Sequence, residues 1–333
     1  MKKLLSRLTF LITGCFIFLL LTTSCAKPTA TPEMDSFTLP VGFVPNVQFA
    51  PFYVGLEKGF FSEQRIDLQL DHSMETDTVA LVGADKLPFG ICSGEQVLLG
   101  LNQGLSLKYI LNWYQRYPVG IVSLADANIK SVTDLKGKKV GIPVLSGASY
   151  IGLEALLLEN QMKDQDLKLE SIGYSQVEML TSGKIDAAVI YVANEPVQLQ
   201  LLGFTTDLIR VSDSISMIGN GLITNEKTLK ENPDLVKRMA TALVKSIEYT
   251  EENPDEAYEI CKKYVDNLAN ADNQELQKQV MIESIALYKD VDNRKTGVSS
   301  ETAWINMSDV MKRMGLIQES VDPHNAYTNE FVE

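Results

Sequence analysis

Residues 41–61 constrain the fold more than any other part of this 333-residue chain, because they read as a strand that passes through a polar turn into a helix. Residues 41–44 are an apolar run, and Pro45 ends it because proline has no N–H to donate to a sheet. Pro51 suits the first turn of the helix, and Gly59 is suited to end it. The pattern predicts an α/β fold, in which small ligands bind beyond the carboxyl ends of the strands.

Alternating strands and helices continue along the chain. We expect further strands at residues 66–70, 87–92, 107–111, 118–123, 170–174, 187–191 and 214–224. Apolar residues at three- and four-residue spacing then predict helices at residues 232–252, 254–267, 273–288 and 299–314. About 300 residues follow the N-terminal segment, which is more than one hydrophobic core usually holds.

The order of these elements predicts a clamp of two discontinuous lobes. We expect lobe 1 at residues 36–124 plus 219–333, and lobe 2 at residues 125–218. Two crossing strands would form the hinge, and Gly219 and Gly221 leave the second crossing without side chains where it would bend. A ligand held between the lobes would lose contact with water when the clamp closes.

The N-terminus is typical of an exported protein. Residues 1–24 have a basic head and an apolar run, which predict a secretory signal peptide rather than a membrane span. Ser24-Cys25 resembles a bacterial lipoprotein processing site, so we expect lipidation of Cys25 and attachment to the extracytoplasmic side of the cell membrane. Cys15 is a weaker alternative, and an uncleaved anchor helix is another. Residues 25–35 are rich in Pro and Thr and predict a flexible tether.

Charge and cysteine content exclude several classes of function. The chain has 30 basic and 43 acidic residues, and loss of the basic signal peptide would make its net charge of −13 more negative. This balance argues against nucleic acid and against electrostatic docking on anionic lipid. Beyond the N-terminal segment only Cys92 and Cys261 remain, which we expect to be buried thiols. With two histidines, a catalytic triad is a poor prediction, and we expect no metal and no cofactor.

The expected binding residues are polar or aromatic side chains in the turns that follow the strands, where helix N-termini expose N–H groups. They are Asn46, Gln48, Phe49, Tyr53, Glu75, Thr76, Ser93, Glu95, Trp113, Tyr114, Ser146, Ser149, Tyr150, Tyr191, Asn194 and Glu195. Each aromatic ring could instead pack in the hydrophobic core. Glu75 and Thr76 could instead cap the helix that begins beside them. The set contains almost no cation, Arg116 being the nearest, which favours a flat uncharged heterocycle over sulfonate, nitrate or phosphate.

Three short patterns in the opening segment resemble a known family. Pro45-Asn46, Ala50-Pro51-Phe52-Tyr53-Val54 and Glu57-Lys58-Gly59-Phe60-Phe61 are similar to the first strand and helix of ABC-importer solute-binding proteins, in the group related to the thiamine-pyrimidine proteins. The resemblance implies a type II periplasmic-binding-protein clamp, a monomer, and a permease with its ATPase as partners. It also implies a ligand that is riboflavin or a formylamino- or hydroxymethyl-pyrimidine.

Riboflavin is the ligand that we favour within this group. The pyrimidine binders usually carry a Trp before the Pro and a His after the turn, where this chain has Phe43 or Val44 and Phe49. Glu75, Glu95 or Asn194 could bind the ribityl hydroxyls. Some relatives are instead pyrimidine synthases with a cysteine-rich iron motif, but this chain has no such run, so we expect no enzyme. A two-lobe sensor without transport remains an open alternative.

Overall fold

The computed structural model describes residues 33–42, 44–72, 75–270, 273–289 and 293–332. The predicted signal peptide, Cys25 and most of the predicted tether lie outside these residues. Within the described part of the chain, no helix combines the length and the apolar character that crossing a membrane requires.

Two small sheets are formed by the first four strands and the last of the strands that the structure describes. Strand β1 (Asp35–Pro40) pairs in parallel with β2 (Ile66–Asp71). In the second sheet β10 (Asn220–Asn225) lies between β3 (Phe89–Ser93) and β4 (Leu107–Asn112) and is antiparallel to both. Every residue of β10 is buried, because this strand is hydrogen-bonded on both sides and covered on both faces.

A five-stranded sheet has the order β7-β6-β8-β5-β9. Its strands are β5 (Val119–Leu124), β6 (Lys139–Ile142), β7 (Lys168–Ser171), β8 (Ala187–Tyr191) and β9 (Thr206–Arg210). Strands β6, β7 and β8 are parallel, so their carboxyl ends share one edge, whereas β5 is antiparallel to both β8 and β9.

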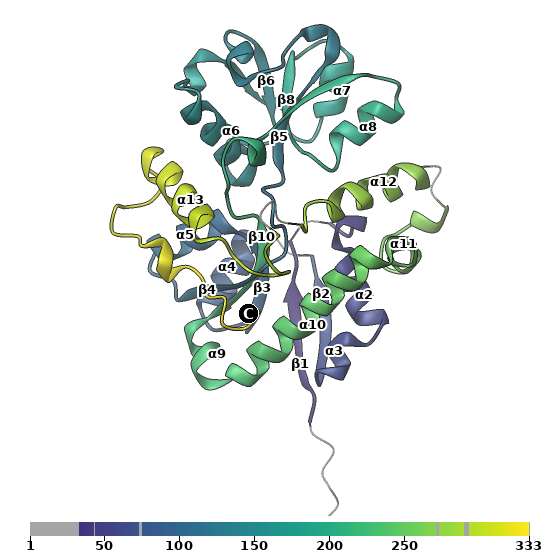
Figure 1. Cartoon of the computed structure of the whole chain (residues 1–333), viewed down its shortest axis with the longest axis vertical. Coiled ribbons are helices and arrows are strands. Elements are labelled where there is room, and N and C mark those ends of the chain that lie inside the picture. The colour runs from purple at the N-terminus through teal and green to yellow at the C-terminus, as the bar shows by residue number, and fades with distance from the viewer. Residues whose placement is uncertain (1–32, 43, 73–74, 271–272, 290–292, 333) are drawn as a thin grey trace, which may run out of the picture. The chain divides into compact units, whose positions relative to one another are not determined.

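Helices cover both faces of the five-stranded sheet. Figure 1 shows α6 (Gly147–Glu159) on one side of it and α7 (Gln176–Thr181) and α8 (Glu195–Leu201) on the other. Alternate residues of the strands accordingly belong to two hydrophobic clusters. Ala188 and Ile190 of β8 lie in the cluster that holds the apolar residues of α7 and α8, and Val189 lies in the one that holds those of α6.

The remaining helices surround the two small sheets. They are α2 (Ala50–Glu57), α3 (Phe60–Glu63), α4 (Glu75–Gly83), α5 (Gly94–Asn102), α9 (Glu226–Glu231), α10 (Pro233–Glu252), α11 (Pro254–Cys261), α12 (Gln274–Ile285) and α13 (Glu301–Arg313). The long helix α10 packs on α2. Gly55 permits this close contact, since a Cβ there would overlap the Ser246 hydroxyl.

Two segments connect the second small sheet to the five-stranded sheet: residues 113–118, which follow β4, and residues 214–219, which precede β10. The two crossings are hydrogen-bonded at their base, where the N–H groups of Trp113 and Tyr114 donate to the carbonyl of Asn220 at 3.0 and 2.9 Å. A Cβ at Gly219 would overlap the Tyr114 carbonyl oxygen. In this structure the glycine therefore serves close packing of the crossings.

Several sequence predictions need correction. Residues 41, 42 and 44, which the structure describes, are not part of the expected strand: β1 ends at Pro40, and Gly42 has a left-handed φ of 73°, which breaks an extended run. Asp35, assigned to the tether, already belongs to β1. Strand β5 pairs with β8 and β9, so the expected boundary at residue 124 lies too late in the chain. The helix expected at 254–267 ends at Cys261.

The prediction about the two cysteines is confirmed. Cys92 and Cys261 are buried free thiols. Trp304 is fully buried among the helices and stacks on Tyr327, with ring centroids 5.6 Å apart. Phe331 is also buried in the hydrophobic core.

Candidate ligand-binding site

A cavity of about 530 Å³ lies between α7 and α8, beside the carboxyl ends of β7 and β8. Its lining is mostly polar and uncharged, and consists of Tyr174, Ser175, Gln176, Val177, Glu178, Thr181, Asn194, Glu195, Gln198 and Leu202. Two of the predicted binding residues, Asn194 and Glu195, are among them. Because both strands end here and both helices begin here, backbone N–H groups and side chains meet at the same edge of the sheet.

Two carboxyl groups line this cavity, Glu178 and Glu195, and Glu195 is the buried one, with only 8% of the residue exposed. Its Oε2 accepts a hydrogen bond from the Tyr191 N–H at 3.2 Å, and its Oε1 accepts one from Asn194 Nδ2 at 3.4 Å. Burial raises the pKa of Glu195 to about 7. Near neutral pH the group therefore exists in both protonation states, and it can donate or accept a hydrogen bond.

Sequence reasoning missed the other eight residues of this lining, among them Tyr174 and Gln176. The strand expected at 170–174 ends at Ser171, so the segment after it is a loop that carries Tyr174 at the rim, 75% exposed. Gln176 is almost fully buried at the start of α7. Gly173, which has a left-handed φ of 61°, was the available signal that the strand had already ended.

The expected serine-rich turn at the start of α6 lies on the same edge of the sheet. Ser146 is exposed, and Ser149 and Tyr150 are partly exposed. Tyr117 of the first crossing donates a hydrogen bond from its hydroxyl to the Ala148 carbonyl at 2.9 Å. This contact holds the start of α6 beside the crossing, but none of the three predicted residues lines the cavity between α7 and α8.

A second group of predicted residues forms a buried carboxyl cluster at the ends of β3 and β10. The Ser93 hydroxyl lies 2.7 Å from Glu75 Oε2 and 2.5 Å from Glu95 Oε1. Asn220 Nδ2 donates to Glu75 Oε1 at 2.8 Å. Glu95 is fully buried, and neither its Oε2 nor Asn220 Oδ1 has a hydrogen-bond partner within the described structure.

One proton must be added to this cluster to satisfy its contacts. The Ser93 hydroxyl has a single hydrogen and cannot donate to both carboxylates. Burial, followed by the charge of Glu75, raises the pKa of Glu95 to about 8, and burial raises the pKa of Glu75 as well. The pair therefore holds one proton at neutral pH, so that one carboxyl group donates to Ser93 while the other accepts.

The carboxyl cluster and the five-stranded sheet influence each other electrostatically through Tyr191. Burial raises the pKa of Tyr191 well above its usual value, and the charges of Glu75 and Glu95 raise it further, followed by Tyr114 and Tyr174. Tyr191 is therefore within electrostatic range of Tyr114 and the two carboxyl groups of the predicted set. Thr76, by contrast, is exposed on the first turn of α4.

The predicted aromatic residues pack mainly on one another. The rings of Trp113 and Tyr114 are stacked at 4.4 Å, and the Phe49 ring lies 5.9 Å from Trp113. All three are buried, as their alternative role as core residues implies. Tyr53 does not join this group, because its ring is stacked on Tyr264 at 4.6 Å.

Asn46 and Gln48 have a local structural role in the turn before α2. Asn46 Oδ1 accepts a hydrogen bond from the Gln48 N–H at 3.0 Å and caps the short 3₁₀ helix Val47–Phe49. Both residues are partly exposed, and neither lines the cavity between α7 and α8.

Three characterised proteins are similar to this chain along most of their length. Riboflavin-binding protein RibY of Chloroflexus aurantiacus is 31% identical over 93% of this chain and 90% of its own. The 4-amino-5-hydroxymethyl-2-methylpyrimidine phosphate synthase of Legionella pneumophila is 24% identical over 89% of this chain and 92% of its own. A formylaminopyrimidine-binding protein of Halalkalibacterium halodurans is 23% identical over 76% of this chain and 78% of its own.

The fold has solved counterparts. The periplasmic aliphatic sulphonate-binding protein SsuA of Escherichia coli superposes with a TM-score of 0.72 at 13% identity, covering 90% of this chain and 94% of its own. At this identity the likeness concerns the fold, and it confirms the predicted periplasmic-binding-protein architecture. The profile of the family described as NMT1/THI5 like matches residues 46–257. The chain therefore belongs to the NMT1/THI5-like family and has the fold of the periplasmic binding proteins.

Proposed function

We propose that this protein is the extracytoplasmic binding protein of an ABC importer, and that it captures riboflavin and delivers it to a membrane permease and its ATPase. The observation that carries the proposal is the similarity to a riboflavin-binding protein, which extends over 93% of this chain at 31% identity.

The cavity between α7 and α8 supports this ligand class. Its volume of about 530 Å³ falls within the range of about 300–1,000 Å³ that is usual for small-molecule sites. Asn194 and Gln176 offer neutral donors and acceptors to the polar edge of a flavin ring, and Glu195 can supply either. Tyr174 lies at the rim, where its ring can stack on a flat heterocycle at low entropic cost.

The expected anchor completes the proposal. A signal peptide at residues 1–24 and lipidation of Cys25 would keep a monomeric protein at the outer face of the cell membrane, close to its permease. Mass spectrometry of the membrane-bound protein tests this part directly. The proposal expects an N-terminal diacylglyceryl Cys25, and a protein that retains Met1 would contradict it.

Titration of the purified protein with riboflavin tests the ligand. We expect flavin fluorescence to be quenched at micromolar protein, and unlabelled formylaminopyrimidine or hydroxymethylpyrimidine not to displace the flavin. Absence of quenching, or binding of a pyrimidine in its place, would reject riboflavin. Pyrimidine phosphate synthase activity of the purified protein would contradict the assignment as a binding protein.

A further inference from the structure

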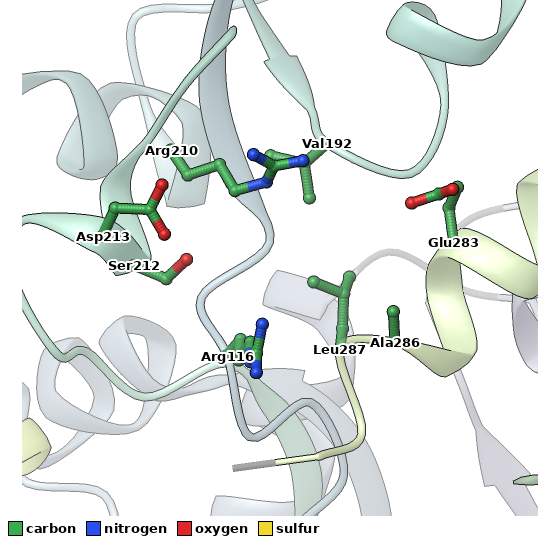
Figure 2. Close-up of a pocket in the computed structure, with 8 residues that line it drawn as sticks. All are labelled: Arg116, Val192, Arg210, Ser212, Asp213, Glu283, Ala286 and Leu287. Atoms are coloured by element: carbon green, nitrogen blue, oxygen red, sulfur yellow. The ribbon is translucent and has the colours of Figure 1, made fainter. Parts of the chain in front are cut away.

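A second cavity, of about 160 Å³, lies at the base of the five-stranded sheet and has charged walls (Figure 2). Arg210, the last residue of β9, and Ser212 and Asp213, which follow the strand, line one side of it. Glu283 of α12 and Leu287 line the facing side, and Arg116 of the first crossing contributes its side chain between them. With Val192, which follows β8, the cavity is therefore built from four segments that are far apart in the sequence.

Several polar groups of this cavity have no protein partner. In the part of the chain that the structure describes, no hydrogen bond or ion pair joins the side chains of Arg210, Ser212 or Asp213 to another residue. Arg116 uses only its Nε, which donates to the Lys289 carbonyl at 3.0 Å. Glu283 Oε1 accepts from Gln279 at 3.2 Å. The lining therefore offers both donors and acceptors to a guest molecule.

The charge balance of the lining indicates what kind of guest fits. Two arginines face two acidic residues, so the cavity has no excess of positive charge for a phosphate or sulfonate. A lining of paired donors and acceptors is best matched by groups that both donate and accept hydrogen bonds, as alcohol hydroxyls do. A volume of about 160 Å³ lies below the range of about 300–1,000 Å³ that is usual for small-molecule sites, which suits a short hydroxylated chain better than a whole flavin.

The position of the cavity connects it to the candidate site. Val192 of its lining directly follows Tyr191, and Arg116 lies two residues after Tyr114. Leu287 precedes Tyr288, whose ring stacks on Tyr114 with centroids 5.8 Å apart. The segment that provides Val192 continues to Asn194 and Glu195, which line the larger cavity. A ligand at the strand ends thus has this polar cavity beside it.

We propose that the cavity between Arg210 and Glu283 is a polyol subsite, which binds the hydroxylated side chain of the ligand while its ring system is bound beside Asn194 and Glu195. The inference rests on the proposed function and deepens it, because it assigns recognition of the side chain to residues that lie outside the ring site. Arg210 and Arg116 donate to the hydroxyl oxygens, and Asp213 and Glu283 accept from the hydroxyl hydrogens.

The test compares riboflavin with lumiflavin, which has the same ring system and a methyl group in place of the hydroxylated chain. Affinities are measured by calorimetry on the full protein and on the variants Arg210→Gln and Glu283→Gln. We expect riboflavin to bind at least about tenfold more tightly than lumiflavin, and each substitution to weaken riboflavin about tenfold while leaving lumiflavin unchanged. Arg313→Gln and Glu231→Gln make the same changes at exposed positions away from the cavity, and should alter neither affinity.

Each outcome bears on the subsite. The subsite is overturned if the unsubstituted protein binds riboflavin and lumiflavin with equal affinity. It is also overturned if the variants keep their melting temperature but lose affinity for both flavins equally. If the protein instead binds flavin mononucleotide more tightly than riboflavin and loses this extra affinity in Arg210→Gln, the cavity is an anion site. That result also overturns the polyol assignment. If lumiflavin and riboflavin both fail to bind, the proposed function itself is wrong, and the subsite falls with it.

Discussion

Replacing Glu95 by Gln should remove a pH dependence from the stability of this protein. Glu95 is fully buried beside Ser93 and Glu75, and burial raises its pKa from the usual 4.5 to about 8. The folded protein therefore retains a proton that the unfolded chain releases, and stability falls as the pH rises from 4.5 toward 8. At about 1.4 kcal/mol per pH unit, the loss across this window is on the order of 3–5 kcal/mol.

The amide introduced by Glu95→Gln would have no charge to acquire, and it can donate to the Ser93 hydroxyl in place of the shared proton. We therefore expect the free energy of unfolding of Glu95→Gln, relative to the unsubstituted protein, to increase by on the order of 3–5 kcal/mol between pH 5 and pH 8. Urea denaturation at one-unit pH steps measures this difference. The matched control Glu231→Gln, at an exposed position, should show a difference that does not change with pH.

A stability difference between Glu95→Gln and the unsubstituted protein that stays constant from pH 5 to pH 8 would refute the reasoning. So would a difference that moves in favour of the unsubstituted protein as the pH rises. Either result would mean that Glu75 and Glu95 are both charged in the folded state and that the Ser93 contacts do not hold a proton.

Three further substitutions test other parts of the structure. Gly219→Ala places a methyl group against the Tyr114 carbonyl oxygen, a backbone atom that cannot easily move. Urea denaturation should therefore show a free energy of unfolding that is lower by about 1–3 kcal/mol. An unchanged denaturation midpoint would contradict the packing of the crossings. Arg238 donates hydrogen bonds to Asp35 of β1 at 2.6 Å and to the Gln64 carbonyl at 2.7 Å. Arg238→Gln should therefore lower the free energy of unfolding by about 1.5–3 kcal/mol in the same assay. The exposed control Arg313→Gln should lower it by less than about 0.5 kcal/mol. Tyr174→Ala should leave stability within about 0.5 kcal/mol, because the side chain is 75% exposed, and should weaken riboflavin binding about tenfold in a fluorescence titration; unchanged affinity would remove Tyr174 from the site.

The sequence predicted best those elements whose boundaries are set by local residues. Strand β8 was expected at 187–191 and observed at Ala187–Tyr191, because an apolar run lies between polar turns. The end of α2 near Gly59, whose φ is 74°, was also foreseeable, since glycine adopts the left-handed conformation that ends a helix.

Elements defined by distant pairing were harder to predict. Strand β1 alternates polar and apolar residues over Asp35–Pro40 and is a strand because it pairs with β2. The pairing stops after Val41, whose N–H donates to the Asp71 carbonyl, because Gly42 turns the chain with a left-handed φ. Strand β5 reads like a continuation of β4 and joins the other sheet only through its pairing with β8 and β9. Local composition contains neither fact.

The sequence predicted where the candidate site lies better than it predicted which residues line it. Carboxyl ends of strands pointed to Asn194, Glu195, Ser93 and Glu95, because this position is set by topology. Which rings face a ligand depends on tertiary packing instead. Trp113 was expected at the site and is 2% exposed, stacked on its neighbour, whereas Tyr174 was overlooked and is 75% exposed at the rim of a cavity.

A crystal structure of the protein with riboflavin tests the central claim most directly. The account predicts flavin density at the carboxyl edge of β7 and β8, with the ring system in contact with Asn194 and Glu195 and the hydroxylated chain directed toward Arg210 and Glu283. Flavin bound at another place, or crystals grown in saturating riboflavin that contain none, would contradict it.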